Sequence, residues 1–174
     1  MDIKKNGFYY ALGIVLFGVL KIAYTHMDAN DLIFILSPTN KMISFLSNSE
    51  SVFLNGSGYF YHDFNILIEK SCSGFNFFIL IFIIGYFVII NHFQNKKFKL
   101  LFFSILSAWV LTVFVNTSRI IIAIFIQKLT PQIQISTWFH QAQGTFVYLF
   151  FLIVFYKTLT YLLTKYFPEN EKLA

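Results

Sequence analysis

The stretch 71-SCSGFNFFILIFIIGYFVII-90 decides the fold. It carries no charged side chain, and it is as long as the roughly 20 apolar residues that a helix needs to cross a bilayer. Cys72, the only cysteine of the chain, lies near its start. The stretch therefore predicts a membrane-spanning helix. It also raises the question whether Cys72 packs as a small apolar side chain or reacts as a thiol.

The whole chain has the composition of a membrane protein. Of its 174 residues, 57% are hydrophobic and 21% aromatic, whereas only 12% are charged, and the mean hydropathy is +0.66. A soluble domain has about 25% charged residues, so this chain has too little charge to cover a water-facing surface. We therefore predict a single transmembrane domain over residues 1–174.

The charged and metal-binding residue types exclude several functions. The net charge of +5 does not indicate nucleic-acid binding, because the lysines cluster at the ends of apolar runs and the chain has one arginine. A single cysteine excludes an intramolecular disulfide framework, and the four scattered histidines show no metal-ligand spacing. We expect no nucleic-acid partner, no metal and no cofactor.

Four apolar runs are long enough to span a membrane. The third is interrupted by a polar stretch, which predicts a break near 116–119. The predicted spans cover approximately residues 8–24, 73–93, 98–126 and 142–164. The expected fold is an all-α polytopic membrane helix bundle with about four to six membrane-associated helices.

The lysines orient the spans. Lys4 and Lys5 precede the first span without a clear cleavage site, so this span is expected to remain as an anchor. Further lysines lie between the second and third spans and near the end of the fourth, and such ends are normally cytoplasmic. The N-terminus is then cytoplasmic, and residues 25–70 and about 120–140 lie on the outer side of a bacterial inner membrane.

Two smaller elements are expected in the outer segment 25–70. Ser37-Pro38 predicts the start of a short amphipathic helix on the membrane surface, and its apolar face would hold Met42, Ile43, Phe45 and Leu46. The stretch 51-SVFLNGSGYFYHDFNILIEK-70 has a turn signal between two β-prone runs. It predicts a small β-hairpin that leads directly to Cys72.

Three residues of different chemistry converge on the outer side in this topology. Cys72 begins the second span, Arg119 ends the main part of the third, and His140 precedes the fourth. A thiolate is a nucleophile, and the partial positive charge of a helix start favours it. His140 could exchange protons with the thiol or a leaving amine, and Arg119 could hold a carbonyl, a carboxylate or an oxyanion. The three residues are plausible for acyl transfer.

Each of these residues also has an ordinary structural explanation. A lone cysteine is often a small buried apolar side chain, and a lone histidine near an interface is often solvated. Asn116, which shares a helix face with Arg119, could simply bond between helices. A non-enzymatic subunit of a transporter or assembly complex therefore stays open. Against it, Arg119 is the only arginine of the chain, and a position that only reaches the lipid headgroups would accept lysine equally well.

The motifs 71-SCSGFN-76, 116-NTSRI-120 and 139-FHQAQGTFVY-148 together resemble the exosortase/archaeosortase family of membrane transpeptidases, over about residues 35–165. The resemblance implies that Cys72 attacks a peptide bond and forms a thioacyl-enzyme. It further implies that His140 protonates the leaving amine and that Arg119 positions the substrate or stabilises the oxyanion. The implied supporting residues are Asn116, Ser73 and Gly74.

The resemblance also implies the partners. The substrate would be an exported protein with a C-terminal sorting signal made of a short motif, an apolar helix and a basic end. A lipid or glycan amine could accept the acyl group. Membrane lipid would surround the enzyme. Larger members have more spans, so the chain resembles a compact bacterial type such as exosortase K. A membrane cysteine protease that uses water as acceptor remains the alternative enzyme.

Overall fold

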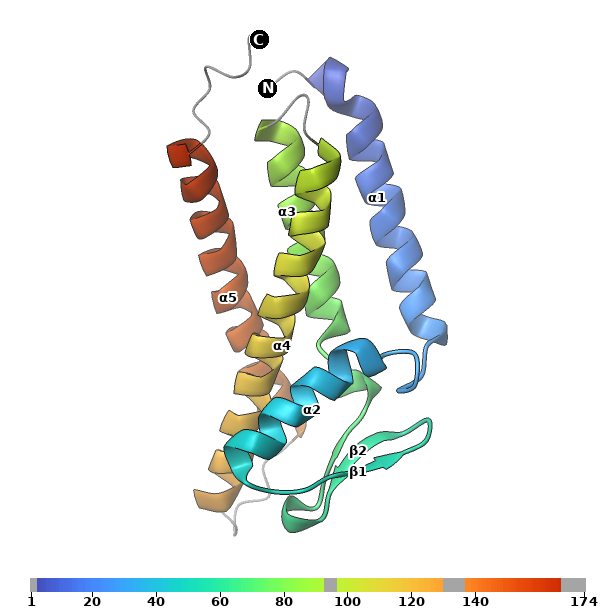
Figure 1. Cartoon of the computed structure of the whole chain (residues 1–174), viewed down its shortest axis with the longest axis vertical. Helices are drawn as coiled ribbons and strands as arrows, with labels where there is room; N and C mark the ends of the chain where they lie inside the picture. The colour runs from blue at the N-terminus through green and yellow to red at the C-terminus, as the bar shows by residue number, and fades with distance from the viewer. Residues whose placement is uncertain (1–2, 93–96, 130–136, 167–174) are drawn as a thin grey trace.

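The computed structural model describes residues 3–92, 97–129 and 137–166. Five α-helices and a small sheet form the described part of the chain (Figure 1). The elements, in chain order, are α1 (Ile3–His26), α2 (Ile33–Ser47), β1 (Val52–Leu54), β2 (Gly58–Tyr61), the 3-10 helix η1 (His62–Phe64), β3 (Ile66–Ile68), the 3-10 helix η2 (Lys70–Cys72), α3 (Phe75–His92), α4 (Lys97–Leu129) and α5 (Thr137–Tyr166). We call the end of the bundle that carries the sheet the sheet end.

Four helices are long and apolar enough to cross a membrane, which confirms the number of spans predicted from the sequence. Their candidate spans are Gly7–His26, Lys70–His92, Leu101–Ile126 and Ala142–Tyr166. The chain is therefore a multi-pass membrane protein with a mostly helical fold.

The predicted break near 116–119 is wrong, because α4 continues through this stretch without interruption. Its polar side chains do not interrupt the helix. Thr117 Oγ1 contacts Met42 Sδ of α2 at 3.9 Å, and Ser118 Oγ donates to the carbonyl of Phe114 one turn earlier. Asn116 bonds to other elements and is fully buried. The polar residues thus have tertiary or local partners, and the helix stays intact.

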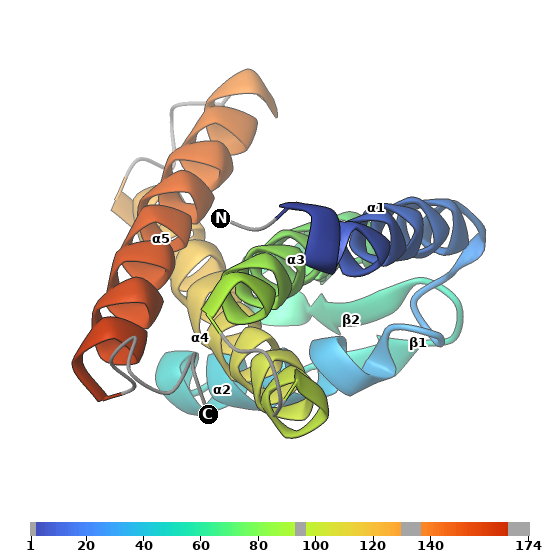
Figure 2. The same cartoon turned by 90° about the horizontal axis from the view of Figure 1, so that it is seen from above.

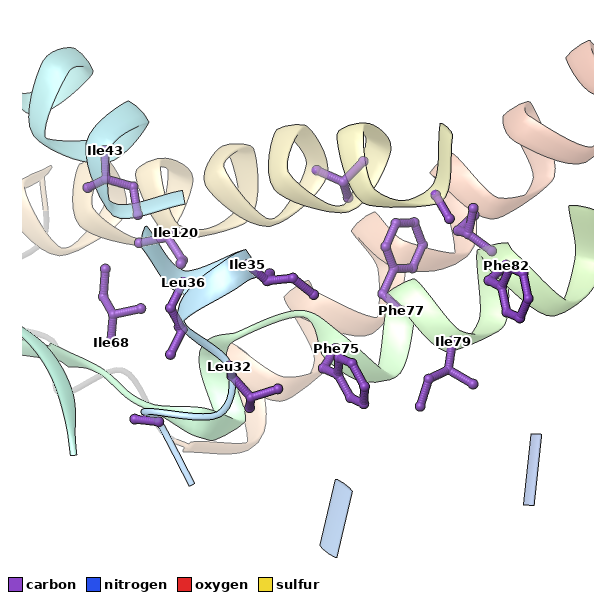
Figure 3. Packing of buried hydrophobic residues seen from close by; sticks show 14 of the residues in the cluster. Leu32, Ile35, Leu36, Ile43, Ile68, Phe75, Phe77, Ile79, Phe82 and Ile120 are labelled. Atoms are coloured by element: carbon purple, nitrogen blue, oxygen red, sulfur yellow. The ribbon is translucent and has the colours of Figure 1, made fainter. Parts of the chain in front are cut away.

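Helix α3 is the central element of the bundle. It lies between α1 and α5 and also packs on α4 (Figure 2). In its span window 61% of the residues are buried, against 6% in the windows of α1 and α5. Figure 3 shows buried side chains of α2, α3 and α4 gathered in one cluster, which also includes Ile68 of β3. The apolar stretch that predicted a span is therefore also the centre of the protein core.

Helices α3 and α4 approach each other closely at Gly85. A Cβ atom on Gly85 would overlap Oγ of Ser104, and that hydroxyl is buried without a hydrogen-bond partner among the described residues. Small residues at such crossings let the backbones of membrane helices approach. The pair Gly85 and Ser104 therefore sets the distance between the two helices.

Gly85→Ala should lower the melting temperature of the detergent-solubilised protein by several degrees, because overpacking a tight contact costs about 1–3 kcal/mol. Ser104→Ala removes the overlapping hydroxyl without breaking a described hydrogen bond. The double variant should thus regain most of the lost stability in a thermal-unfolding assay. A double variant no more stable than Gly85→Ala alone would show that this contact does not set the spacing.

Helix α2 begins at Ile33, so the predicted start at Ser37-Pro38 is wrong. The Asp28 carboxylate accepts the backbone N–H groups of Asn30 (2.7 Å) and Asp31 (3.2 Å), which forms the turn before the helix. Pro38 lies inside α2 and cannot donate to the carbonyl of Phe34. That carbonyl instead accepts the indole N–H of Trp109 in α4 at 2.9 Å. A tertiary hydrogen bond thus replaces the one that proline removes.

The apolar face predicted for α2 is partly wrong. Ile43 is fully buried, whereas Met42, Phe45 and Leu46 are exposed. Ile43 lies instead on the stripe that packs against the core, and this stripe holds Ile35, Leu36, Thr39, Asn40 and Ile43. The exposed apolar residues form a separate stripe, because neighbouring helical positions differ by about 100°.

The predicted hairpin is present, but a third strand extends it. Strands β1, β2 and β3 form an antiparallel sheet in that order. The Tyr61 hydroxyl connects the sheet to α2, lying 2.7 Å from Asn40 Oδ1 and 2.8 Å from Ser44 Oγ. Burial raises the pKa of this hydroxyl, so it stays neutral at physiological pH. The sheet is thereby fixed against α2, and its last strand, β3, is followed by η2.

Candidate active site

Cys72 is the last residue of η2, directly before α3. Its backbone N–H donates to the carbonyl of Glu69 at 2.9 Å, which closes the short turn. Ser73 Oγ then accepts the N–H of Phe75 at 3.2 Å and so caps the start of α3. The sequence thus folds locally into a turn that presents a free, half-buried thiol at a helix N-terminus.

The thiol has a polar environment on its own turn. Ser71 Oγ lies 3.8 Å from Cys72 Sγ and 2.7 Å from Glu69 Oε1, to which it donates. Among the described residues, Ser71 is the only hydrogen-bond partner of the Cys72 side chain. Most hydrogen bonds of this residue therefore run through its backbone, while its side chain packs, partly buried, against the apolar core.

Gly74 allows this turn to approach α4. It adopts a left-handed conformation with φ of 76°, which glycine adopts without strain. A Cβ atom there would lie 3.1 Å from Cγ of Asn116 and 3.2 Å from Cγ2 of Thr112. Any larger residue would push the cysteine turn away from α4.

A chain of hydrogen bonds joins Cys72 to Arg119. Asn116 Nδ2 donates to the Cys72 carbonyl at 2.6 Å, and Asn116 Oδ1 accepts the Tyr148 hydroxyl at 2.8 Å. The same hydroxyl accepts Nη1–H of Arg119 at 3.0 Å. Asn116 and Arg119 share a face of α4, as expected from their spacing. The cysteine turn, α4 and α5 are thus connected at one level of the bundle.

Tyr148 is the member of this network that the sequence analysis did not single out. Its ring stacks on Phe77 of α3, with centroids 4.6 Å apart and planes at 14°. The signal was present in 139-FHQAQGTFVY-148, where positions 140, 144 and 148 recur every four residues. Residues at this spacing lie on one helix face, so a tyrosine two turns from His140 was a candidate for the same site.

The side chain of Arg119, a residue of α4, lies between α4 and α5. A Cβ atom on Gly144 would lie 3.2 Å from Arg119 Cδ and 3.3 Å from Nη1, so the glycine makes room for the guanidinium. Arg119 Cζ is 5.2 Å from the centroid of the Tyr148 ring, a cation–π distance. Arg119 Nε is buried and has no acceptor among the described residues.

His140 lies in the first turn of α5, and its side chain lies outside the described residues. Its backbone position is four residues before Gly144, which contacts Arg119. The placement of its imidazole beside Cys72 and Arg119 stays a prediction. Asn116, Arg119 and the Cys72 turn are brought together in the described part, with Ser73 and Gly74 shaping the turn.

Helix α1 also reaches this site, which the sequence analysis did not predict. Lys21 Nζ donates to Asn76 Oδ1 at 2.8 Å, and the Tyr24 hydroxyl donates to the Lys70 carbonyl at 3.1 Å. Lys70 Nζ in turn donates to the Thr25 carbonyl at 3.2 Å. Helix α1 therefore packs beside the turn that carries Cys72.

The described side chains contain no group of three or more His, Cys, Asp or Glu residues that could hold a metal ion. The chemistry available in the described part is therefore that of a thiol, a guanidinium, an amide and hydroxyl groups. These are components of a site that could bind and attack a carbonyl.

Together these features define a class: a polytopic membrane protein with a cysteine at the start of its central span, whose backbone carbonyl is linked through Asn116 and Tyr148 to an arginine. A comparison with protein families identifies the relatives. The model of the transmembrane exosortase family (EpsH) matches residues 8–157. The chain therefore belongs to the transmembrane exosortase family. Comparisons with curated proteins and with solved structures give no match.

Proposed function

We propose that this exosortase-family protein is a cysteine transpeptidase that removes the C-terminal sorting signal of an exported protein. One observation carries the proposal. Asn116 bonds to the Cys72 carbonyl on one side and to Tyr148 on the other, and Tyr148 bonds to Arg119. The backbone of the residue that carries the only thiol is thus linked to the only arginine of the chain, which supports a shared site.

The proposed first step is attack of the Cys72 thiolate on the carbonyl carbon of the scissile peptide. The C–N bond then breaks, a thioester forms, and the leaving amine takes a proton from His140. Arg119 donates hydrogen bonds to the substrate carbonyl or to the oxyanion that develops on it. The N-terminus of α3 favours the thiolate over the thiol by its partial positive charge.

The proposed second step resolves the thioester. An amine of a lipid or glycan attacks the acyl carbon, and the Cys72 sulfur leaves as thiolate. His140 takes the proton released by the attacking amine, so the enzyme returns to its starting state. Water in place of the amine would give hydrolysis instead, with a free carboxylate on the product.

The proposed orientation places the N-terminus in the cytoplasm and the sheet end on the outer side of a bacterial inner membrane. Lys97 and Lys99 lie in the first turn of α4, at the end of the bundle opposite the sheet end, and by the positive-inside rule they support this orientation. At the sheet end, by contrast, basic residues are accompanied by the acidic residues Asp28, Asp31, Glu50, Asp63 and Glu69. Cys72 would then meet an exported chain where its apolar helix leaves the membrane.

Co-expression tests this function. Exported host proteins that end in a short motif, an apolar helix and a basic tail would each be produced with and without this chain, and the new C-terminus measured by mass spectrometry. We expect at least one to lose its tail and gain the mass of an acceptor. A free carboxylate at the new terminus would instead identify a protease. Intact tails on all of them, with the enzyme inserted and folded, would contradict the proposal.

A further inference from the structure

Tyr148 occupies a position in the site that requires both functions of a phenol hydroxyl. The hydroxyl donates to Asn116 Oδ1 (2.8 Å) and accepts from Arg119 Nη1 (3.0 Å). Phenylalanine has the same ring but can do neither. These two bonds also determine the orientation of the Asn116 amide, whose nitrogen then points to the Cys72 carbonyl at 2.6 Å.

The ring of Tyr148 is held in place independently of its hydroxyl. It stacks on Phe77 of α3 at 4.6 Å, and the Arg119 guanidinium approaches the ring to 5.2 Å. Gly144, one turn earlier in α5, leaves the space that Arg119 needs. The ring therefore holds the hydroxyl in position between Asn116 and Arg119.

Tyr148 also connects α5 to the rest of the bundle. Only 6% of the α5 span window is buried, and α5 packs on the core with one face, formed by Val147, Tyr148, Phe151, Leu152 and Phe155. His140 lies eight residues before Tyr148 on the same helix, or about 12 Å along the axis. The bonds of Tyr148 therefore influence the level at which this part of α5 meets Cys72.

We propose that Tyr148 is a positioning residue of the site: its hydroxyl holds Arg119 and Asn116, and through Asn116 the backbone of Cys72, in the arrangement used for acyl transfer. The catalytic part of this inference rests on the proposed function. The positional part, that the Tyr148 hydroxyl controls the cysteine turn, does not depend on it.

Two variants separate the hydroxyl from the ring and from general effects on α5. Tyr148→Phe keeps the ring that stacks on Phe77 and removes both hydrogen bonds. Tyr156→Phe is the matched control, because Tyr156 lies eight residues further along α5 with an exposed side chain. Cys72 is the only cysteine, so alkylation by N-ethylmaleimide reports on this thiol alone in the full-length, detergent-solubilised protein.

In the alkylation arm, Tyr148→Phe should change the rate at Cys72 at least about threefold, whereas Tyr156→Phe should leave it at the wild-type value. In the activity arm, with an exported protein that the wild type processes, Tyr148→Phe should lower kcat about 10–100-fold with KM changed less than about twofold. Such a split indicates loss of an interaction used in the transition state and not of substrate binding.

A double-mutant cycle distinguishes positioning from a general loss of structure. If Tyr148 acts through Arg119, the factor by which Tyr148→Phe lowers kcat should be at least about fivefold smaller in an Arg119→Lys background than in the wild type. Equal costs in both backgrounds would overturn the proposal. So would a Tyr148→Phe variant with wild-type alkylation, or with altered alkylation but wild-type kcat. A wild type that processes no tail would contradict the proposed function alone, and the alkylation arm would still decide whether Tyr148 controls the cysteine turn.

Discussion

Cys72→Ala is expected to abolish removal of the sorting signal and to leave the protein inserted and folded. If the thiol forms the covalent bond to the substrate, its loss should lower the rate by at least about 10³-fold, as expected for a missing nucleophile. The fold should tolerate the change, because alanine keeps both backbone hydrogen bonds of Cys72 and loses only the 3.8 Å contact of Sγ with Ser71 Oγ and part of the apolar packing. Processing is measured by the size of the exported protein in cells, and folding by thermal unfolding in detergent.

Ser71→Ala is the matched control for Cys72→Ala. Ser71 adjoins the cysteine; its hydroxyl bonds to Glu69 and lies 3.8 Å from Cys72 Sγ, but it forms or breaks no bond in the proposed chemistry. This variant should retain processing within a few-fold of the wild type. Normal processing by Cys72→Ala would end the proposal of a thioacyl-enzyme, whereas a loss of folding in that variant would show that the thiol itself packs.

Asn116→Ala should have the second largest effect, because it destabilises the fold and disconnects the site. Asn116 is fully buried, and its loss leaves the Cys72 carbonyl and the Tyr148 hydroxyl without their shared partner. Such a loss costs about 1–3 kcal/mol, enough to lower the melting temperature by several degrees. Processing should fall together with stability.

Asn116→Asp separates these two effects. The side chain keeps its size but replaces the donor toward the Cys72 carbonyl by an acceptor, so the bond to the cysteine turn becomes a repulsion. We expect processing to be lost even at temperatures where the variant is folded. Ser118→Ala serves as control on the same helix, since Ser118 bonds only to the carbonyl of Phe114 in the described part. Wild-type processing by Asn116→Asp would mean that the connection from α4 to Cys72 is not needed.

Much of the fold follows from the sequence because membrane spans depend on length and apolar composition. The four spans were predicted correctly for this reason, and the hairpin before Cys72 was predicted correctly from the turn signal between its two β-prone runs. The start of α2 was not, since the hydrogen bond from Trp109 to the Phe34 carbonyl, which lets the helix contain Pro38, joins residues 75 positions apart. The third strand was missed because it is only three residues long, Ile66–Ile68, and it is defined by its pairing with β2.

The site was predictable in part for a similar reason. Alternating spans imply that Cys72 and Arg119 lie at the same level, and the chain of bonds through Asn116 and Tyr148 connects them there. The role of Tyr148 depends on rotation of α5 about its axis, which topology does not determine. A tyrosine in an aromatic-rich span resembles any other interfacial aromatic residue until its hydroxyl is seen between an arginine and an asparagine.

The central claim is that Cys72 carries the acyl group of the substrate, and trapping this intermediate tests it most directly. The enzyme would be mixed with an exported protein that it processes, quenched in acid within the first turnover, digested and examined by mass spectrometry. We predict that the peptide containing Cys72 carries the newly formed C-terminal segment of the substrate and that hydroxylamine releases it, as expected of a thioester. Processing in which that peptide stays unmodified, or in which the acyl group is found on another residue, would contradict the account.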